Sequence, residues 1–156
     1  TFGEANYNPL PCCSKIIRER STRPSLIAPM FMHILLCALL YVFLTLARAP
    51  SVWGVGKNKD GSNPFADIQP KVSANLSNQF EWPLFFHVVC ALLIALGEPI
   101  SNSQVFLAWV FVIGRVLHSL VQIFTDNIRL RGLVFTINFV AVLAMWLLLF
   151  IEQVLG

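Results

Sequence analysis

The sequence "LIAPMFMHILLCALLYVFLTLA" at residues 26–47 contains no Asp, Glu, Lys or Arg. A helix needs about 20 apolar residues to cross about 30 Å of hydrocarbon, so this stretch predicts a membrane-spanning helix. Pro29 falls in its first turn, where a missing backbone N–H costs no hydrogen bond. We expect residues 1–25 to form a polar tail and residues 26–156 to form a transmembrane domain.

The composition of the whole chain agrees with a membrane protein. The 156 residues are 56% hydrophobic and only 12% charged. A soluble domain carries about 25% charged residues, so this chain cannot cover its surface with polar groups. The net charge of +3 is small, and the basic residues lie in short segments between apolar runs. This distribution indicates a topology signal, and we expect no nucleic-acid partner.

Three more stretches are long and apolar enough to span a bilayer. They are residues 80–96, 104–124 and 133–155. Short connections join these three spans, which favours antiparallel neighbours. Period-two alternation is absent, so a transmembrane barrel is excluded. The sequence therefore predicts an all-α integral membrane four-helix bundle.

The longer connection at residues 48–77 is rich in turn-forming residues. Those that indicate turns are Gly54, Gly56, Gly61, Pro64 and Pro70. Its basic residues, counted with those of the connection before the fourth span, favour cytoplasmic loops and external termini. The glycosylation sequon at Asn75 lies close to the membrane, and we interpret it as a chance match.

The stretch "NQFEWPLFF" at residues 78–86 introduces polar residues at the start of the second span. Asn78 is expected to cap this helix, and the Glu81 carboxylate to lie near its positive end. Pro83 is then early enough to be tolerated, and Trp82 suits the membrane interface. Ser101 and Gln104 have the spacing of a capping box at the start of the third span.

The four cysteines do not form a metal or redox motif. Cys37 and Cys90 lie in apolar runs, where buried thiols behave as small hydrophobic residues. Cys12 and Cys13 are adjacent in the tail, where either lipidation or plain solvent exposure is open. His87, His118 and Glu81 could converge, but no HExxH or ExxH pair is present on one helix, and we expect no metal site.

The third span carries a polar stripe. Arg115, His118 and Gln122 are spaced i, i+3, i+7 and share one helical face, which Asp126 and Arg129 continue. Such a stripe must face the bundle, a partner chain or a wet cleft.

Arg115 stays charged and needs a counter-charge, for which Glu81 is the natural candidate. Such an Arg115–Glu81 pair could also fix the helix register without any ligand. His33 and His87 are each interpreted as isolated packing histidines, and Asn138 as a helix–helix hydrogen-bonding residue.

Three segments together resemble the MAPEG superfamily, the membrane-associated proteins of eicosanoid and glutathione metabolism. They are "SNQFEWPLFF" at 77–86, "AWVFVIGRVLHSLVQ" at 108–122 and "NIRLRG" at 127–132. The resemblance covers roughly residue 77 to the C-terminus, and the "GRVLHS" segment is similar to the small bacterial branch.

This resemblance implies a four-helix subunit of a homotrimer in a bacterial inner membrane. Glutathione would bind between subunits near the cytosolic face, with its thiol ionised for attack on a lipophilic electrophile. A thiol with an ordinary pKa of about 8.5 needs positive charge or hydrogen-bond donors to ionise. The implied catalytic residues are Arg115 and His118, and the implied ligand-binding residues are Asn78, Glu81, Gln122 and Arg129.

The chain also departs from the family pattern. Ala74 stands where the enzymes carry a glutathione-binding arginine, and the nearest upstream base is Lys71. His118 and Gln122 stand at positions where the enzymes have tyrosines. An imidazolium could stabilise a thiolate, so His118 can keep the role.

Two functions therefore stay open. One is a glutathione- or thiol-dependent transferase or peroxidase acting on lipophilic compounds. The alternative is a catalytically silent accessory or structural subunit of a larger membrane complex, binding lipid or quinone at a relic cleft.

Overall fold

The apolar stretches of the sequence form long helices in the computed structural model, which describes residues 25–97 and 99–155. The helices are α2 (Ile27–Trp53), α3 (Ile68–Asn78), α4 (Pro83–Leu96), α5 (Asn102–Phe124), α6 (Ile128–Phe150) and the short π-helix η1 (Ile151–Leu155). In this part of the chain, four helical stretches are long and apolar enough to span a membrane, with α3 and α4 together forming the second. The predicted all-α membrane four-helix bundle is confirmed.

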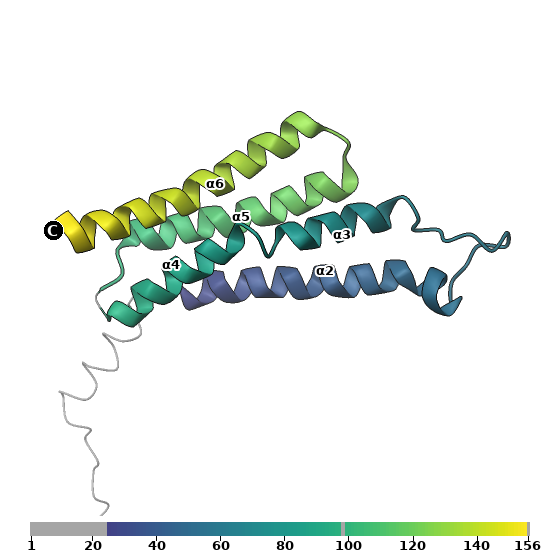
Figure 1. Cartoon of the computed structure of the whole chain (residues 1–156), viewed down its shortest axis with the longest axis horizontal. Helices are drawn as coiled ribbons and strands as arrows, with labels where there is room; N and C mark the ends of the chain where they lie inside the picture. Colours follow the sequence, from purple (N-terminus) through teal and green to yellow (C-terminus); the bar gives the residue numbers. More distant parts are fainter. Residues whose placement is uncertain (1–24, 98, 156) are drawn as a thin grey trace, which may run out of the picture.

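The helices run alongside one another in Figure 1. The α2–α3 loop and the α5–α6 connection lie at one end of the bundle, and the α4–α5 connection lies at the other with the C-terminus. Large apolar side chains such as Phe31, Leu39 and Phe106 are exposed on the outside, as a lipid solvent requires. The predictions for Cys12, Cys13 and the polar tail fall on residues 1–24, outside the described residues.

Two apolar clusters form the core. The first joins α4, α5 and α6 and includes a stacked pair, Phe86 and Phe111, whose ring centroids are 4.2 Å apart. The second joins α2, α3 and α5 around Leu40, Val72 and Ile123. On α5, a buried polar segment separates the residues of one cluster from those of the other. The packing of the subunit therefore places polar side chains at its centre.

The connection between the first two spans is shorter than the sequence predicts. Gly54, Gly56 and Gly61 have positive φ angles, so these predicted turns are confirmed. Gly54 ends α2 in the left-handed conformation, with its N–H donating to the Pro50 carbonyl over 3.2 Å. Pro70 instead lies in the first turn of α3, where its missing N–H is tolerated, so its assignment to a turn is wrong.

Side-chain caps fix the starts of α5 and α6. Ser101 Oγ accepts a hydrogen bond from the Gln104 N–H at 3.3 Å, which is one half of the expected capping box. The Gln104 side chain does not reach back, because its amide donates to the Met145 carbonyl on α6 at 3.2 Å. Asn127 Oδ1 accepts from the Leu130 N–H at 3.1 Å, so α6 begins at Ile128 and Arg129 lies in its first turn.

The second span is a helix interrupted at residues 79–82, between α3 and α4. Pro83 causes the interruption, since its ring clashes with the carbonyl four residues earlier and it has no N–H to donate. Asn78 is the last residue of α3, and α4 has no side-chain cap. The prediction that Asn78 caps a helix beginning here is wrong, because the chain is already helical before the proline.

Candidate functional site

Arg115 of α5 is fully buried at the level of this interruption. Its Nε donates to Gln79 Oε1 at 3.0 Å, and its Nη2 donates to the backbone carbonyl of Asn78 at 2.8 Å. In an unbroken helix that carbonyl would accept from the N–H of residue 82. The interruption therefore frees a backbone acceptor, and the guanidinium takes it.

The predicted ion pair between Arg115 and Glu81 is wrong. Glu81 is exposed, and no ion pair joins the two side chains in the described residues. Neutral acceptors replace the carboxylate, because an amide oxygen and a backbone carbonyl satisfy two of the donors without desolvating a second charge.

Gln79 connects three helices through its amide group. Its Oε1 accepts from Arg115 and lies 3.1 Å from His33 Nε2 of α2. Its Nε2 donates to Asn75 Oδ1 at 2.8 Å and to Ser119 Oγ at 3.1 Å. Sequence reasoning missed Gln79 and Ser119, although Ser119 follows Arg115 by one helical turn and Gln79 lies in the quoted 78–86 stretch.

Asn75 is fully buried and accepts from both Gln79 and Ser119. A glycan needs an exposed asparagine, so the interpretation of this sequon as a chance match is confirmed.

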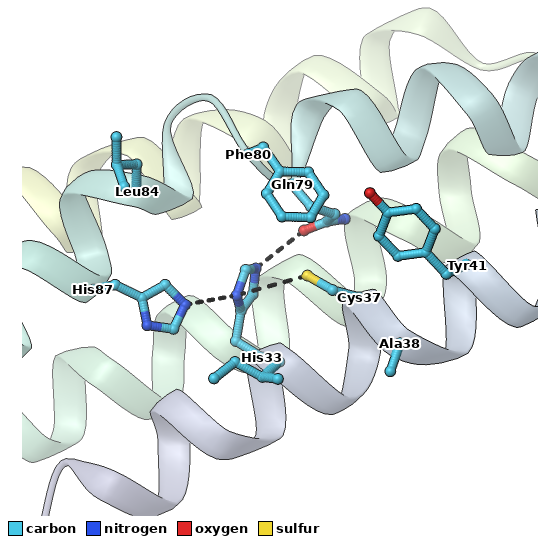
Figure 2. A pocket seen from close by; sticks show the side chains of 9 residues that line it. His33, Cys37, Ala38, Tyr41, Gln79, Phe80, Leu84 and His87 are labelled. Atoms are coloured by element: carbon cyan, nitrogen blue, oxygen red, sulfur yellow. Dashed lines mark hydrogen bonds between the residues drawn. The ribbon is translucent and has the colours of Figure 1, made fainter.

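His33 and His87 form a pair, and neither is isolated. His33 Nδ1 lies 3.0 Å from His87 Nε2, and Cys37 Sγ lies 4.0 Å from the same His33 nitrogen. The two histidines line a pocket of about 480 Å³ between α2 and α4 (Figure 2). In the described part of the chain, no cluster of three or more His, Cys, Asp or Glu side chains is suited to hold a metal ion.

His118 lies one turn beyond Arg115 on the same face of α5, and its side chain is 3% exposed. Neither of its ring nitrogens has a hydrogen-bond partner among the described residues, and neither does Arg115 Nη1. Buried polar atoms are normally paired, so three unpaired atoms on one helical face need an explanation.

The structure joins some of the predicted site residues and leaves others apart. Asn78 Nδ2 donates to Gln122 Oε1 at 3.4 Å, so these two lie beside each other and close to Arg115. Glu81 and Arg129 are exposed, and no hydrogen bond or ion pair within the described residues links either to this group.

A second, more polar pocket of about 270 Å³ begins where the stripe on α5 ends. Gln122, Lys71 and Arg131 line it, together with residues of the α5–α6 connection. Lys71 Nζ lies 2.6 Å from Asp126 Oδ1. Asp126, which continues the polar stripe of α5, therefore pairs with Lys71 of α3 at the edge of the pocket.

Comparison with known proteins decides the family. A model of the MAPEG family matches residues 26–151, which include the first three spans and most of the fourth. The chain belongs to the MAPEG family. Neither the curated proteins nor the solved structures compared with it gave a match. The protein is thus an integral membrane member of the superfamily of eicosanoid and glutathione metabolism.

The resemblance implies an arginine at position 74, where this chain has alanine. Ala74 is exposed on α3, on the same helix as Lys71. The polar pocket therefore has a lysine and Arg131 near it, but lacks a guanidinium at position 74.

The hydrogen bonds of Arg115 predict different stability effects for substitutions of Glu81 and Gln79. We expect Glu81→Gln to change the free energy of unfolding by less than about 0.5 kcal/mol, as exposed substitutions usually do. Gln79→Leu should cost about 2–3 kcal/mol, because it leaves buried donors without an acceptor. Unfolding by titration of a denaturing detergent into mixed micelles measures both. Equal losses of unfolding free energy in Glu81→Gln and Gln79→Leu would support the Arg115–Glu81 ion pair.

Proposed function

We propose that this MAPEG protein is a thiol-dependent transferase or peroxidase that uses glutathione and acts on lipophilic compounds. The observation that carries the proposal is the set of three unpaired buried atoms, Arg115 Nη1 and the two ring nitrogens of His118. A thiol placed against this face of α5 would accept a hydrogen bond from Arg115 Nη1 and donate one to a ring nitrogen of His118.

The chemistry assigns one role to each side chain. His118 accepts the thiol proton, and Arg115 Nη1 donates a hydrogen bond that stabilises the thiolate. In a transferase reaction, the new bond joins sulfur to the electrophilic carbon, and the leaving group departs with its electron pair. With a hydroperoxide, sulfur takes one oxygen and an alcohol leaves, after which a second thiol gives disulfide and water.

The polar pocket supports a charged thiol peptide as the ligand. Gln122 lies one turn beyond His118 and lines this pocket, so the pocket leads toward the proposed thiol site. Arg131 supplies positive charge for the carboxylates in place of the guanidinium absent at Ala74, whereas Lys71 already pairs with Asp126 at the edge of the pocket. Glu81 and Arg129 are exposed, which leaves them available to ligand bound by a neighbouring subunit of a homotrimer. We place this assembly in a bacterial inner membrane.

Replacement of His118 tests the proposal. Purified protein in nanodiscs is incubated with glutathione and 1-chloro-2,4-dinitrobenzene, and the coloured conjugate is followed. We expect His118→Phe to lower kcat at least about 100-fold, the usual contribution of a positioned acid or base. His87→Phe is the matched control and should retain the rate. If wild type and His118→Phe share the same negligible rate, the catalytic proposal is wrong.

One observation favours the second candidate function, a catalytically silent subunit that binds lipid or quinone beside His118. Arg115 already donates to Gln79 and to the Asn78 carbonyl, so it stabilises the α3–α4 junction without any ligand. A silent subunit would co-purify with larger partner proteins in mild detergent. A homotrimer that is active alone would exclude this alternative.

A further inference from the structure

We propose that the pocket between α2 and α4 is a second binding site, which binds a membrane-soluble phenol. His87 Nδ1 accepts a hydrogen bond from the hydroxyl group of the phenol. This site is separate from the proposed thiol site, since neither Arg115 nor His118 lines the pocket. The proposal does not depend on the proposed function.

The first step of the argument is the orientation of Gln79. A guanidinium only donates hydrogen bonds, so the Gln79 atom 3.0 Å from Arg115 Nε must be the amide oxygen. The amide nitrogen then faces Asn75 Oδ1 and Ser119 Oγ, both of which can accept. Arg115 thus fixes which way this amide points.

The second step assigns the protons of His33. Gln79 Oε1 can only accept, so the His33 Nε2 that lies 3.1 Å away carries the proton. His33 is 2% exposed and shares Gln79 Oε1 with the Arg115 guanidinium. A second positive charge beside this buried cation at membrane depth is unfavourable, so the imidazole is neutral. His33 Nδ1 is therefore an acceptor.

The third step assigns the proton of His87. Because His33 Nδ1 accepts, His87 Nε2 at 3.0 Å must donate. A charged imidazole at membrane depth is unfavourable for His87 as well, so its ring is neutral and has one N–H. His87 Nδ1 therefore carries a lone pair and no proton. Figure 2 shows this second ring nitrogen pointing away from His33, and no hydrogen bond among the described residues engages it. The chain of hydrogen bonds from Arg115 thus ends in a single acceptor.

The pocket that His87 lines is mostly apolar and aromatic, and the Tyr41 hydroxyl and the Gln79 amide are further polar groups along it. Leu84, Phe80 and Tyr41 line it, and each is about half exposed on the outer face of the bundle. His33 and Tyr41 are eight residues apart on α2, so the pocket spans about 12 Å of the membrane depth at 1.5 Å per residue. Ligand therefore enters from the hydrocarbon region.

These features together select the ligand chemistry. At His87 Nδ1, a lone-pair acceptor binds a donor and cannot pair with a carboxylate or an ether, which can only accept. A phenolic hydroxyl is a strong donor, and its ring suits a pocket flanked by Tyr41 and Phe80, whose centroids are 6.1 Å apart. Neither imidazole needs to change its protonation state when the phenol binds.

Two probes that differ only in the hydroxyl group test the proposal. The protein in nanodiscs is titrated with 4-nonylphenol and with 4-nonylanisole, in which a methyl group replaces the hydroxyl proton. We expect saturable binding of one phenol per chain and at least a tenfold weaker affinity for the methyl ether. ¹⁵N spectra of histidine-labelled protein should show the Nδ1 resonance of His87 shifting only with the phenol. Equal affinities, or no saturable phenol binding, would overturn the proposal.

Variants separate this site from the thiol site. His87→Phe should abolish phenol binding, whereas the matched variant His118→Phe should leave it unchanged while lowering glutathione conjugation. If His87→Phe does not fold, Ala38→Trp serves instead, because Ala38 is an exposed residue that lines the pocket and makes no part of the hydrogen-bonded chain. Undiminished phenol binding in both His87→Phe and Ala38→Trp would show that the phenol binds elsewhere.

Discussion

The Arg115→Leu variant should lose about 3 kcal/mol of unfolding free energy, since each buried acceptor left unpaired costs about 1–3 kcal/mol. Leucine fills part of the guanidinium volume but cannot donate. The Asn78 carbonyl would then be unpaired at the helix interruption, and Gln79 Oε1 would keep only His33 as its donor. Denaturing-detergent titration in mixed micelles, followed by circular dichroism, measures the loss.

A conservative variant shows whether the hydrogen bonds or the volume cause this loss. Lysine keeps a charge and can reach one of the two acceptors, so Arg115→Lys should recover about half of the stability. Hydrogen exchange at residues 79–82 should also become faster in Arg115→Leu, because the guanidinium holds this segment against α5. An Arg115→Leu protein as stable as wild type would contradict the role of Arg115 at the α3–α4 junction.

The Gly114→Ala variant should lose about 2–3 kcal/mol, at the upper end of what overpacking usually costs. A Cβ at position 114 would lie 1.9 Å from Asn138 Oδ1 and 3.0 Å from Asn138 Cγ. Asn138 is fully buried, so its side chain must rotate within the packed core to admit the added methyl group. The same detergent titration measures the effect.

Two further variants give this prediction its controls. Gly132→Ala in α6 has nothing within 4 Å of the added Cβ, so it should gain about 0.5–1 kcal/mol from helix propensity alone. Asn138→Ala removes the atoms that clash, and neither polar atom of Asn138 has a hydrogen-bond partner in the described residues. Adding Gly114→Ala to Asn138→Ala should therefore cost far less than Gly114→Ala alone. A simple sum of the two losses would mean that the pair does not touch.

Hydropathy predicted the four spans because lipid exposure demands long apolar runs. It did not predict α3, whose residues are on average neither apolar nor polar and whose buried positions include Asn75. The polar stripe on α5 was found because Arg115, His118 and Gln122 share one helical face, and all three are buried.

Partners across helices were harder to predict. The sequence interpretation gave Arg115 a carboxylate, because a buried charge suggests an opposite charge. The fold instead offers an amide and a backbone carbonyl that only the interruption exposes. His33 and His87 are 54 residues apart, and nothing local indicates that their helices place them 3.0 Å from each other.

The length of α2 has a consequence for how the subunit sits in the bilayer. Its 27 residues span about 40 Å, which exceeds a hydrocarbon thickness of about 30 Å. Arg48 lies about 32 Å from the start of the helix, so the last turn belongs among the headgroups. The following loop, with Lys57 and Lys59, extends beyond the α5–α6 connection in Figure 1. A soluble protease can reach this projection from one side only, so tryptic cleavage there reports the orientation of the inserted subunit.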